Sequence, residues 1–214
     1  SLNVSVYQKL FAHGLALGDD AQHRIYGARK RDLFADLEGT VVEIGPGTGV
    51  NLPYLPDGIR WIGLEPNPHM HDWLRPKLDD RHIDAELSTA SAEQTELDDD
   101  SADVVISTLV LCSVPDVSAA LQEIRRILKP GGTFRFIEHV AAQPGHWLRY
   151  VQKGIRPVWR PVADGCCPDR ETGAVINQAG FAEVHYERFD ARVPIVSPHI
   201  MGTATESENK APGE

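Results

Sequence analysis

Two acidic residues and a glycine-rich turn lie at the ends of two successive apolar runs. Glu43 is near the end of the first run, and Gly45, Gly47 and Gly49 follow at alternate positions, while Glu65 ends the second run. Glycine in such a turn permits positive φ angles and lets a ligand approach the backbone closely. A carboxylate at the end of the next strand can accept hydrogen bonds from both hydroxyls of a ribose. This pattern predicts a nucleotide-binding site.

The spacing of the glycines indicates which nucleotide fits. Dinucleotide-binding proteins use G-x-G-x-x-G, whose third glycine allows close helix–strand packing below a bound pyrophosphate. Here the third glycine comes one residue early, as G-P-G-T-G, and Glu43 would face an anionic pyrophosphate unfavourably. A nicotinamide-dependent oxidoreductase is therefore disfavoured. S-adenosylmethionine fits better, because it carries adenosine and a positive sulfonium but no phosphate.

The composition bounds the class of protein. The chain has 214 residues, 42% of them hydrophobic, and a formal net charge of -10, so nucleic acid is not expected as a partner. No apolar run approaches the roughly 20 residues that cross a bilayer, and the first residues do not resemble a signal peptide. The three cysteines are an odd count without metal-ligand spacing, which favours a reducing cytoplasm.

Short β-branched runs alternate with helical patterns through the middle of the chain. Helices are expected within residues 5–37, after Gly49, and at the segments 69–78, 117–132 and 171–180. Strands are expected near residues 40–45, 60–66, 83–90, 101–114 and 133–142. Alternation of this kind predicts an α/β fold with an open, mostly parallel, doubly wound sheet that helices cover on both faces. In such a sheet the ligand lies beyond the carboxyl ends of the strands.

After residue 142 the pattern loosens. Residues 181–192 and 198–206 are expected to form an antiparallel strand pair at one edge of the sheet. The segment around Trp147, Tyr150 and Trp159 is either an apolar lid over the acceptor or a helix packed over the sheet. We therefore expect one domain over residues 1–205, with a helical cap (1–37), a cofactor-binding core (38–142) and an acceptor-side lid with the terminal strand pair (143–205). Residues 206–214 are expected to be a polar, frayed tail.

Five motifs occur in an order that resembles class I S-adenosylmethionine-dependent methyltransferases. They are E-I-G-P-G-T-G, the acid at 65, S-A-E at 91–93, D-V-V-I-S-T-L-V-L-C at 103–112 and L-K-P-G-G at 128–132. The resemblance covers roughly residues 25–142. It implies a Rossmann-like, seven-stranded sheet with a reversed last strand, and S-adenosyl-L-methionine as the cofactor.

A narrower resemblance extends to about residue 202. T-L-V-L-C-S-V, G-G-T-F-R-F-I-E-H-V-A-A, D-G-C and P-H-I are similar to the subgroup that includes the thiol S-methyltransferases of animal endomembranes. Those relatives carry an apolar N-terminal anchor that this sequence does not show. We therefore expect no integral membrane segment, and we expect a cytoplasmic location. The resemblance implies methyl transfer to a small-molecule acceptor, with a thiol as the leading choice.

The resemblance also assigns cofactor contacts. The glycine turn and Glu43 would line the methionine end of the cofactor, and Glu65 would hold the ribose. Further contacts would come from Pro66 and Asn67 at the ribose or adenine, Ala92 and Glu93 at the adenine edge, and Thr108 and Leu109 beside the methyl donor. Each has a plainer interpretation: the glycines can merely form a turn, Leu109 can be core, and Glu93 can be a solvated acid.

Candidates for catalysis lie on the acceptor side. His139 ends the fifth predicted strand and could take a proton from the acceptor, whereas Asp164 and Cys166 lie in the divergent segment. Cys166 can equally be a small buried hydrophobe. No H-E-x-x-H, C-x-x-C or cluster of acids appears, so no metal is expected. Two other functions stay open: an O-, N- or C-methyltransferase for a quinone, lipid headgroup or natural product, and a non-catalytic S-adenosylmethionine-binding module.

Overall fold

The architecture is an α/β sandwich around one sheet. The structure is a computed structural model that describes residues 2–81 and 83–210. Within these residues the sheet has seven strands in the order β3-β2-β1-β4-β5-β7-β6. In chain order they are β1 (Thr40–Ile44), β2 (Arg60–Leu64), β3 (Asp84–Ser88), β4 (Ala102–Thr108), β5 (Leu128–His139), β6 (Glu183–Asp190) and β7 (Pro198–Thr205).

The sheet is parallel except at its last strand. β7 pairs antiparallel with both β5 and β6, and β1 to β5 pair in parallel. The prediction of a Rossmann-like, seven-stranded, mostly parallel sheet with a reversed last strand is therefore confirmed. The strand order reverses beside β1, which places the carboxyl ends of β1 and β4 at the switch point where such sheets bind ligands.

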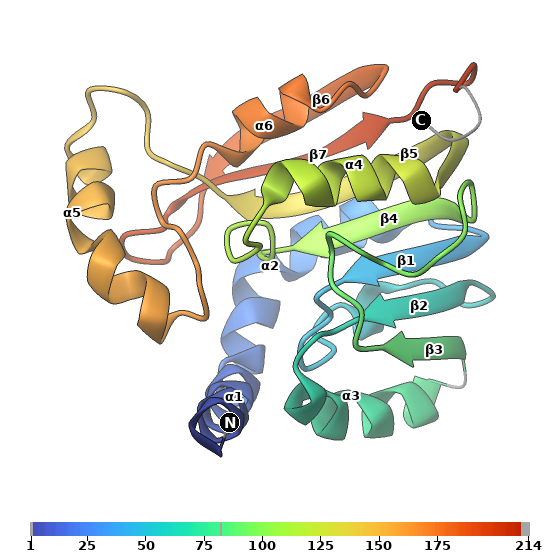
Figure 1. Ribbon diagram of the computed structural model, residues 1–214, viewed down its shortest axis with the longest axis horizontal. Coiled ribbons are helices and arrows are strands. Elements are labelled where there is room, and N and C mark those ends of the chain that lie inside the picture. The colour runs from blue at the N-terminus through green and yellow to red at the C-terminus, as the bar shows by residue number, and fades with distance from the viewer. Residues whose placement is uncertain (1, 82, 211–214) are drawn as a thin grey trace.

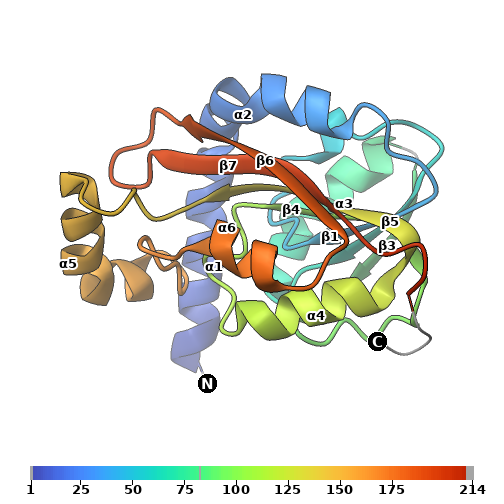
Figure 2. The same ribbon diagram turned by 90° about the horizontal axis from the view of Figure 1, so that it is seen from above.

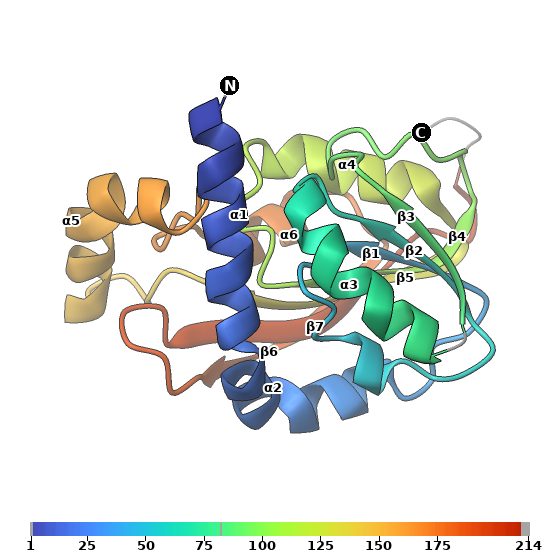
Figure 3. The ribbon, with the colours of Figure 1, turned by 90° about the horizontal axis from the view of Figure 1, so that it is seen from below.

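Helices cover both faces of the sheet. Figure 2 shows α4 (Val117–Ile127) and α6 (Thr172–Gln178) on one face, and α2 (Asp19–Phe34) and α3 (Pro68–Arg81) on the other. α1 (Leu2–Leu17) crosses the edge where the parallel strands end (Figure 3), and α5 (Trp147–Val162) lies beyond that edge (Figure 1). None of the described helices is both long and apolar enough to cross a bilayer.

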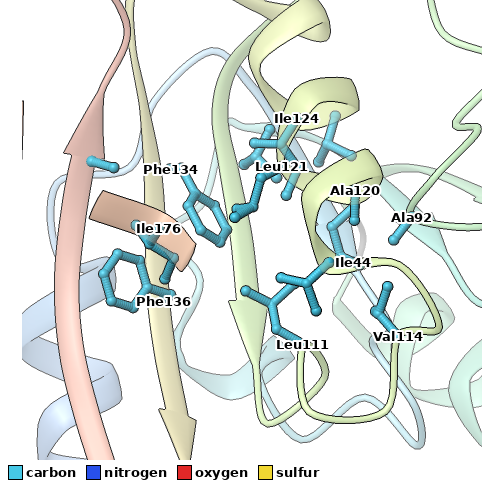
Figure 4. Close-up of a cluster of buried hydrophobic side chains, with 14 of the residues drawn as sticks. Ile44, Ala92, Leu111, Val114, Ala120, Leu121, Ile124, Phe134, Phe136 and Ile176 are labelled. Atoms are coloured by element: carbon cyan, nitrogen blue, oxygen red, sulfur yellow. The ribbon is translucent and has the colours of Figure 1, made fainter. Parts of the chain in front are cut away.

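Two buried clusters hold the layers together. On the α4 face, Ala120, Leu121 and Ile124 pack with Phe134 and Phe136 of β5 (Figure 4). Their spacing follows from the helical period, which brings residues three and four apart onto one face. On the other face, the core is built by α2 and the sheet together, from Tyr26, Leu33, Phe34, Trp61 and Ile137.

The prediction of a helix after Gly49 is wrong. In its place is a single 3-10 turn, Leu52–Tyr54. Pro53 and Pro56 explain the difference, because proline has no N–H and disfavours the helical region for the residue before it. The glycine turn is therefore held by side chains rather than by a helix that follows it directly.

The segment after residue 142 is more regular than expected. Trp147–Val162 forms the helix α5, which lies beyond the strand ends rather than over a face of the sheet. Buried Gln152 fixes it, because its Oε1 accepts from Ala142 N at 2.8 Å and its Nε2 donates to Ile195 O at 2.9 Å. Trp147, Tyr150, Val158 and Val162 of this helix are exposed.

The expected fraying after residue 205 is also wrong where the structure describes it. Glu206 is buried and forms a bidentate pair with Arg125 of α4. The Lys210 ammonium donates to three carbonyl oxygens near the end of α4, those of Arg125, Arg126 and Leu128. Residues 211–214 lie outside the described residues.

The α4 core predicts a cost for removing Ile124. We expect Ile124→Ala to lower the free energy of unfolding by about 2–5 kcal/mol, because the substitution leaves a cavity in a fully buried cluster. Urea denaturation measures this. The matched control is Val162→Ala, at a side chain that is 71% exposed, which should change stability by less than about 0.5 kcal/mol. Equal losses in both variants would contradict this assignment of the core.

Candidate active site

The glycine turn after β1 has three glycines with positive φ but two different environments. The φ angles are +60° at Gly45, +56° at Gly47 and +84° at Gly49. A Cβ on Gly45 would lie 2.8 Å from Val110 Cγ2, and one on Gly49 would lie 2.6 Å from Leu74 Cδ1. A Cβ on Gly47 would meet no atom within 4 Å. The positive φ angles favour glycine at all three positions, and Gly47 differs from the other two because it leaves open space beside the backbone.

Glu65 connects the end of β2 to this turn. Its Oε2 accepts from Gly47 N at 3.0 Å, and its Oε1 accepts from Asn67 N at 2.9 Å. The residue is 8% exposed, and burial raises the pKa of its carboxyl although both backbone donors lower it. A carboxylate has about four acceptor positions, so two remain for further donors such as a vicinal diol.

Glu43 is enclosed by the protein. Its Oε1 accepts from Asn51 Nδ2 at 2.8 Å and its Oε2 accepts from Trp61 Nε1 at 2.9 Å. Burial raises the pKa of this carboxyl to about 6. Asn51 Nδ2 also donates to Thr108 Oγ1 at 2.9 Å, so this amide links the ends of β1 and β4. Its Oδ1 is buried and has no partner among the described residues.

The other predicted cofactor residues lie along the same edge. Leu109 follows β4 with a φ of +61° and donates its N–H to Ile137 O at 2.8 Å. Pro66 and Asn67 lead into α3, where Asn67 Oδ1 accepts from His69 N at 3.1 Å. Ala92 is buried in the α4 core, and Glu93 Oε1 accepts from Asp116 N at 3.3 Å, before α4. Hydrogen bonds thus connect Glu43 to Thr108 through Asn51, and Glu65 directly to Gly47 and Asn67, whereas Ala92 and Glu93 contact α4 and the residue before it.

α1 contacts both a predicted cofactor residue and the predicted acceptor-side segment. Gln8 O accepts from Asn67 Nδ2 at 3.1 Å, and Tyr7 OH accepts from Asp164 N at 3.1 Å. Asp164 has a φ of +47°, and burial raises the pKa of its carboxyl. Its negative charge in turn contributes to the raised pKa of Glu65. The predicted acceptor-side acid therefore lies near the predicted ribose-binding acid, beneath one helix.

His139 and Cys166 are in contact, although nothing in the sequence around either residue predicts this. His139 Nε2 is 3.0 Å from Cys166 Sγ, and Trp159 Nε1 donates to the same sulfur at 3.3 Å. The neighbouring Cys112 thiol, together with hydrogen bonds from His139 and Trp159, lowers the pKa of the Cys166 thiol, whereas the pKa of Cys112 is raised. His139 Nδ1 is buried without a partner among the described residues.

Several residues of this region were not predicted from the sequence. Asn51 and Cys112 lie in segments whose neighbours were predicted, so their positions after β1 and β4 were a usable signal. No sequence signal indicates the roles of Tyr7 and Asp19. Asp19 accepts from Thr48 Oγ1 at 2.7 Å and from Lys77 Nζ at 2.8 Å, and these hydrogen bonds connect α2 to the glycine turn.

Two hollows of the structure lie away from these residues. One, of about 120 Å³, is lined by residues 140–144 with Arg149, Glu171 and Arg188 among others. A wider one of about 600 Å³ lies between α3 and β3, against Arg75, Leu78 and Leu87. Neither contains a predicted site residue. Backbone geometry and hydrogen bonds, rather than either of these two hollows, therefore define the candidate site.

Comparison with known proteins gives consistent matches. Residues 42–136 match the family model described as a methyltransferase domain. The chain is 37% identical to human thiol S-methyltransferase TMT1B over 209 residues, which cover 92% of this chain and 86% of that protein. It is 34% identical to human thiol S-methyltransferase TMT1A over 192 residues, with 84% and 79% covered. A solved S-adenosylmethionine-dependent methyltransferase from Aquifex aeolicus has a TM-score of 0.65 at 15% identity, with 91% and 97% covered, which supports the fold alone.

The burial of Glu43 predicts a pH-dependent loss of stability. The pKa of its carboxyl is raised from 4.5 to about 6 in the folded state, chiefly by burial, with Lys30 opposing and Glu65 adding to the shift. The folded state therefore favours the protonated acid, and its stabilising contribution is lost as pH rises from 4.5 through 6. We expect the wild type to lose about 2 kcal/mol relative to Glu43→Gln across this window.

Chemical denaturation of both proteins at a series of pH values measures that difference. The amide side chain introduced by Glu43→Gln cannot accept from both Asn51 and Trp61, which adds an offset that is the same at every pH. Only the pH-dependent part is informative, and a difference that stays flat through the window would contradict the raised pKa.

Proposed function

The chain belongs to the S-adenosylmethionine-dependent methyltransferases, in the family that includes the thiol S-methyltransferases, and we propose that it methylates the sulfur of a small thiol. The observation that carries the acceptor class is the similarity to human thiol S-methyltransferase TMT1B, which extends over 92% of this chain. At that coverage the similarity extends well beyond residues 42–136, which match the methyltransferase-domain model.

The turn after β1 is chemically suited to S-adenosylmethionine. Open space beside Gly47 allows close approach to the backbone, and the unpartnered Oδ1 of Asn51 can accept from a cationic amino group. Glu43 would act through Asn51, since its own oxygens already accept from Asn51 and Trp61. The negative charges of Glu43 and Glu65 favour a cationic ligand over a diphosphate.

The remaining cofactor contacts follow the edge of the sheet. Glu65 would accept from the ribose hydroxyls with its free acceptor positions, with Pro66 and Asn67 beside the sugar or base. Ala92 and Glu93 would flank the adenine, and Thr108 and Leu109 would lie beside the methyl group. When bound, S-adenosylmethionine supplies an activated methyl group on a sulfonium.

The chain's own contribution is alignment and exclusion of water. α1 contacts Asn67 through Gln8 and Asp164 through Tyr7, and α5 presents exposed aromatic side chains beyond the strand ends. His139, Asp164 and Cys166 would face the acceptor. A thiol is partly ionised near neutral pH and needs less assistance from a base than an alcohol does, so no dedicated triad is required.

The direct test is a turnover assay against a panel of acceptors. Purified protein with S-adenosylmethionine is incubated with alkyl and aryl thiols, and with an amine, a phenol and a quinol of similar size. Mass spectrometry then follows the thioether and S-adenosylhomocysteine. We expect methylated products from thiols only. Methylation of another acceptor class would overturn the acceptor assignment, and tight cofactor binding without turnover would favour a non-catalytic binding module.

Removing the Glu65 carboxylate should weaken cofactor binding. We expect Glu65→Ala to reduce S-adenosylhomocysteine affinity by about 1.5–3 kcal/mol, or roughly 10- to 150-fold, because a charge-assisted pair of contacts is lost. Titration calorimetry gives the dissociation constants. Glu86→Ala is the matched control, since this carboxylate lies on neighbouring β3 and pairs with Arg60 at the surface. Wild-type affinity in Glu65→Ala would remove this residue from the site.

A further inference from the structure

Two thiols and one imidazole meet beyond the ends of β4 and β5. Cys112 follows β4, His139 ends β5 and Cys166 follows α5, so they come from three distant segments of the chain. Their ligating atoms all lie within 4.8 Å of one another, and all three residues are buried. A thiol-rich, histidine-containing set of this kind is typical of zinc sites.

We propose that Cys112, His139 and Cys166 form a Zn²⁺ site with three protein ligands and a fourth position left for an exogenous ligand. Zinc sites with three protein ligands and one open position are catalytic rather than structural in type, and Cys₂His is one of their known ligand sets.

The distances suit a tetrahedral ion. Bond lengths of about 2.3 Å to sulfur and about 2.0–2.1 Å to nitrogen imply separations of about 3.8 Å between two sulfur ligands and about 3.6 Å between sulfur and nitrogen. His139 Nε2 and Cys166 Sγ are 3.0 Å apart, and 4.8 Å bounds every pair. The required separations lie between these values, so small side-chain shifts would accommodate the ion.

Surrounding groups hold the ligands in place. Trp159 donates its indole N–H to Cys166 Sγ at 3.3 Å, an outer hydrogen bond of the kind that orients metal ligands. Cys112 O accepts from Cys167 N at 2.9 Å, which joins the two cysteine-bearing segments directly. Arg170 NH1 donates to Leu111 O at 2.5 Å and to Val114 O at 2.7 Å, and so fixes the loop on both sides of Cys112.

The third cysteine provides an internal comparison. Cys167 is adjacent to Cys166 and is also buried, but its Sγ lies near Gly165 O and the Arg170 guanidinium rather than in the cluster. Burial of cysteine alone therefore does not explain the convergence of the other two on His139.

The role of the open position rests on the proposed function. On binding there, an acceptor thiol would lose its proton to solvent, and its sulfur would be held as a thiolate. That sulfur would then attack the methyl carbon of S-adenosylmethionine: the new sulfur–carbon bond forms as the carbon–sulfonium bond breaks. The products are a neutral thioether and S-adenosylhomocysteine, with no net oxidation or reduction.

The test uses Co²⁺ as a spectroscopic substitute for Zn²⁺. Reduced, metal-free protein is titrated with Co²⁺ under nitrogen. We expect one equivalent to give the intense visible bands of a tetrahedral site and the near-ultraviolet band of thiolate-to-cobalt charge transfer, both abolished by added Zn²⁺. Circular dichroism and thermal melts establish that each variant is folded.

Variants separate the ligands from their neighbours. Cys112→Ser, Cys166→Ser and His139→Asn should each weaken Co²⁺ binding by at least about 100-fold, since even outer partners are worth roughly 10- to 100-fold. Trp159→Phe should weaken it by about tenfold, and Cys167→Ser should bind as the wild type does. The proposal is overturned if the wild type shows no charge-transfer band, if folded ligand variants bind Co²⁺ normally, or if Cys112 and Cys166 form a disulfide whose reduction yields no Co²⁺ uptake.

Two further readouts separate the metal site from the proposed function. Adding a small alkyl thiol to the Co²⁺-loaded protein should shift the visible bands, whereas the corresponding alcohol should not; unchanged bands would overturn the thiol as the fourth ligand. Calorimetry with S-adenosylhomocysteine is run in parallel. Normal nucleoside binding and thiol methylation without Co²⁺ uptake would remove only the metal site, whereas Co²⁺ uptake without nucleoside binding would remove only the proposed function.

Discussion

The hydrogen bond between Glu65 and Gly47 N is the contact on which the candidate site depends. It joins the end of β2 to the turn after β1, so the two strands present one continuous surface at their carboxyl ends. No long helix directly follows the glycine turn to hold it in place, because the next segment forms only a short 3-10 turn. A buried acid at the end of the second strand thus shapes the turn and offers acceptor positions to a ligand.

A second buried acid, Glu43, connects the ends of further strands at the same edge. Glu43 gathers Asn51 and Trp61, and Asn51 in turn reaches Thr108 at the end of β4. Both acids have pKa values raised by burial, so keeping them ionised without a compensating charge is unfavourable. A cationic ligand would relieve that cost, whereas an anionic one would add to it. The electrostatics of this edge and the chemistry of a sulfonium nucleoside are therefore complementary.

Local sequence was sufficient for the sheet and for the residues at strand ends. Gly45, Glu65 and His139 could be placed because each follows or ends an apolar run, and parallel strands bring such positions to one edge. Contacts made by α1 could not be predicted, since Tyr7 is 157 positions from Asp164 along the chain and nothing in either segment indicates the pairing. The 3-10 turn after Gly49 differs from the prediction for another reason: alternation of strands and helices favoured a helix there, whereas Pro53 and Pro56 disfavour one.

The cluster of Cys112, His139 and Cys166 could not be predicted from residue spacing in the sequence. Metal motifs are recognisable in sequence when two ligands lie on one turn or one helix face, but Cys112 lies after β4, His139 at the end of β5 and Cys166 after α5. Only the topology unites them: β4 and β5 are adjacent and parallel, so Cys112, just beyond the end of β4, and His139, at the end of β5, come to one edge. α5 then returns the chain to that edge with Cys166. If the segment that carries α5 covers the acceptor as proposed, it would also supply a sulfur to the proposed metal site, so a movement of α5 would change metal coordination and acceptor access together.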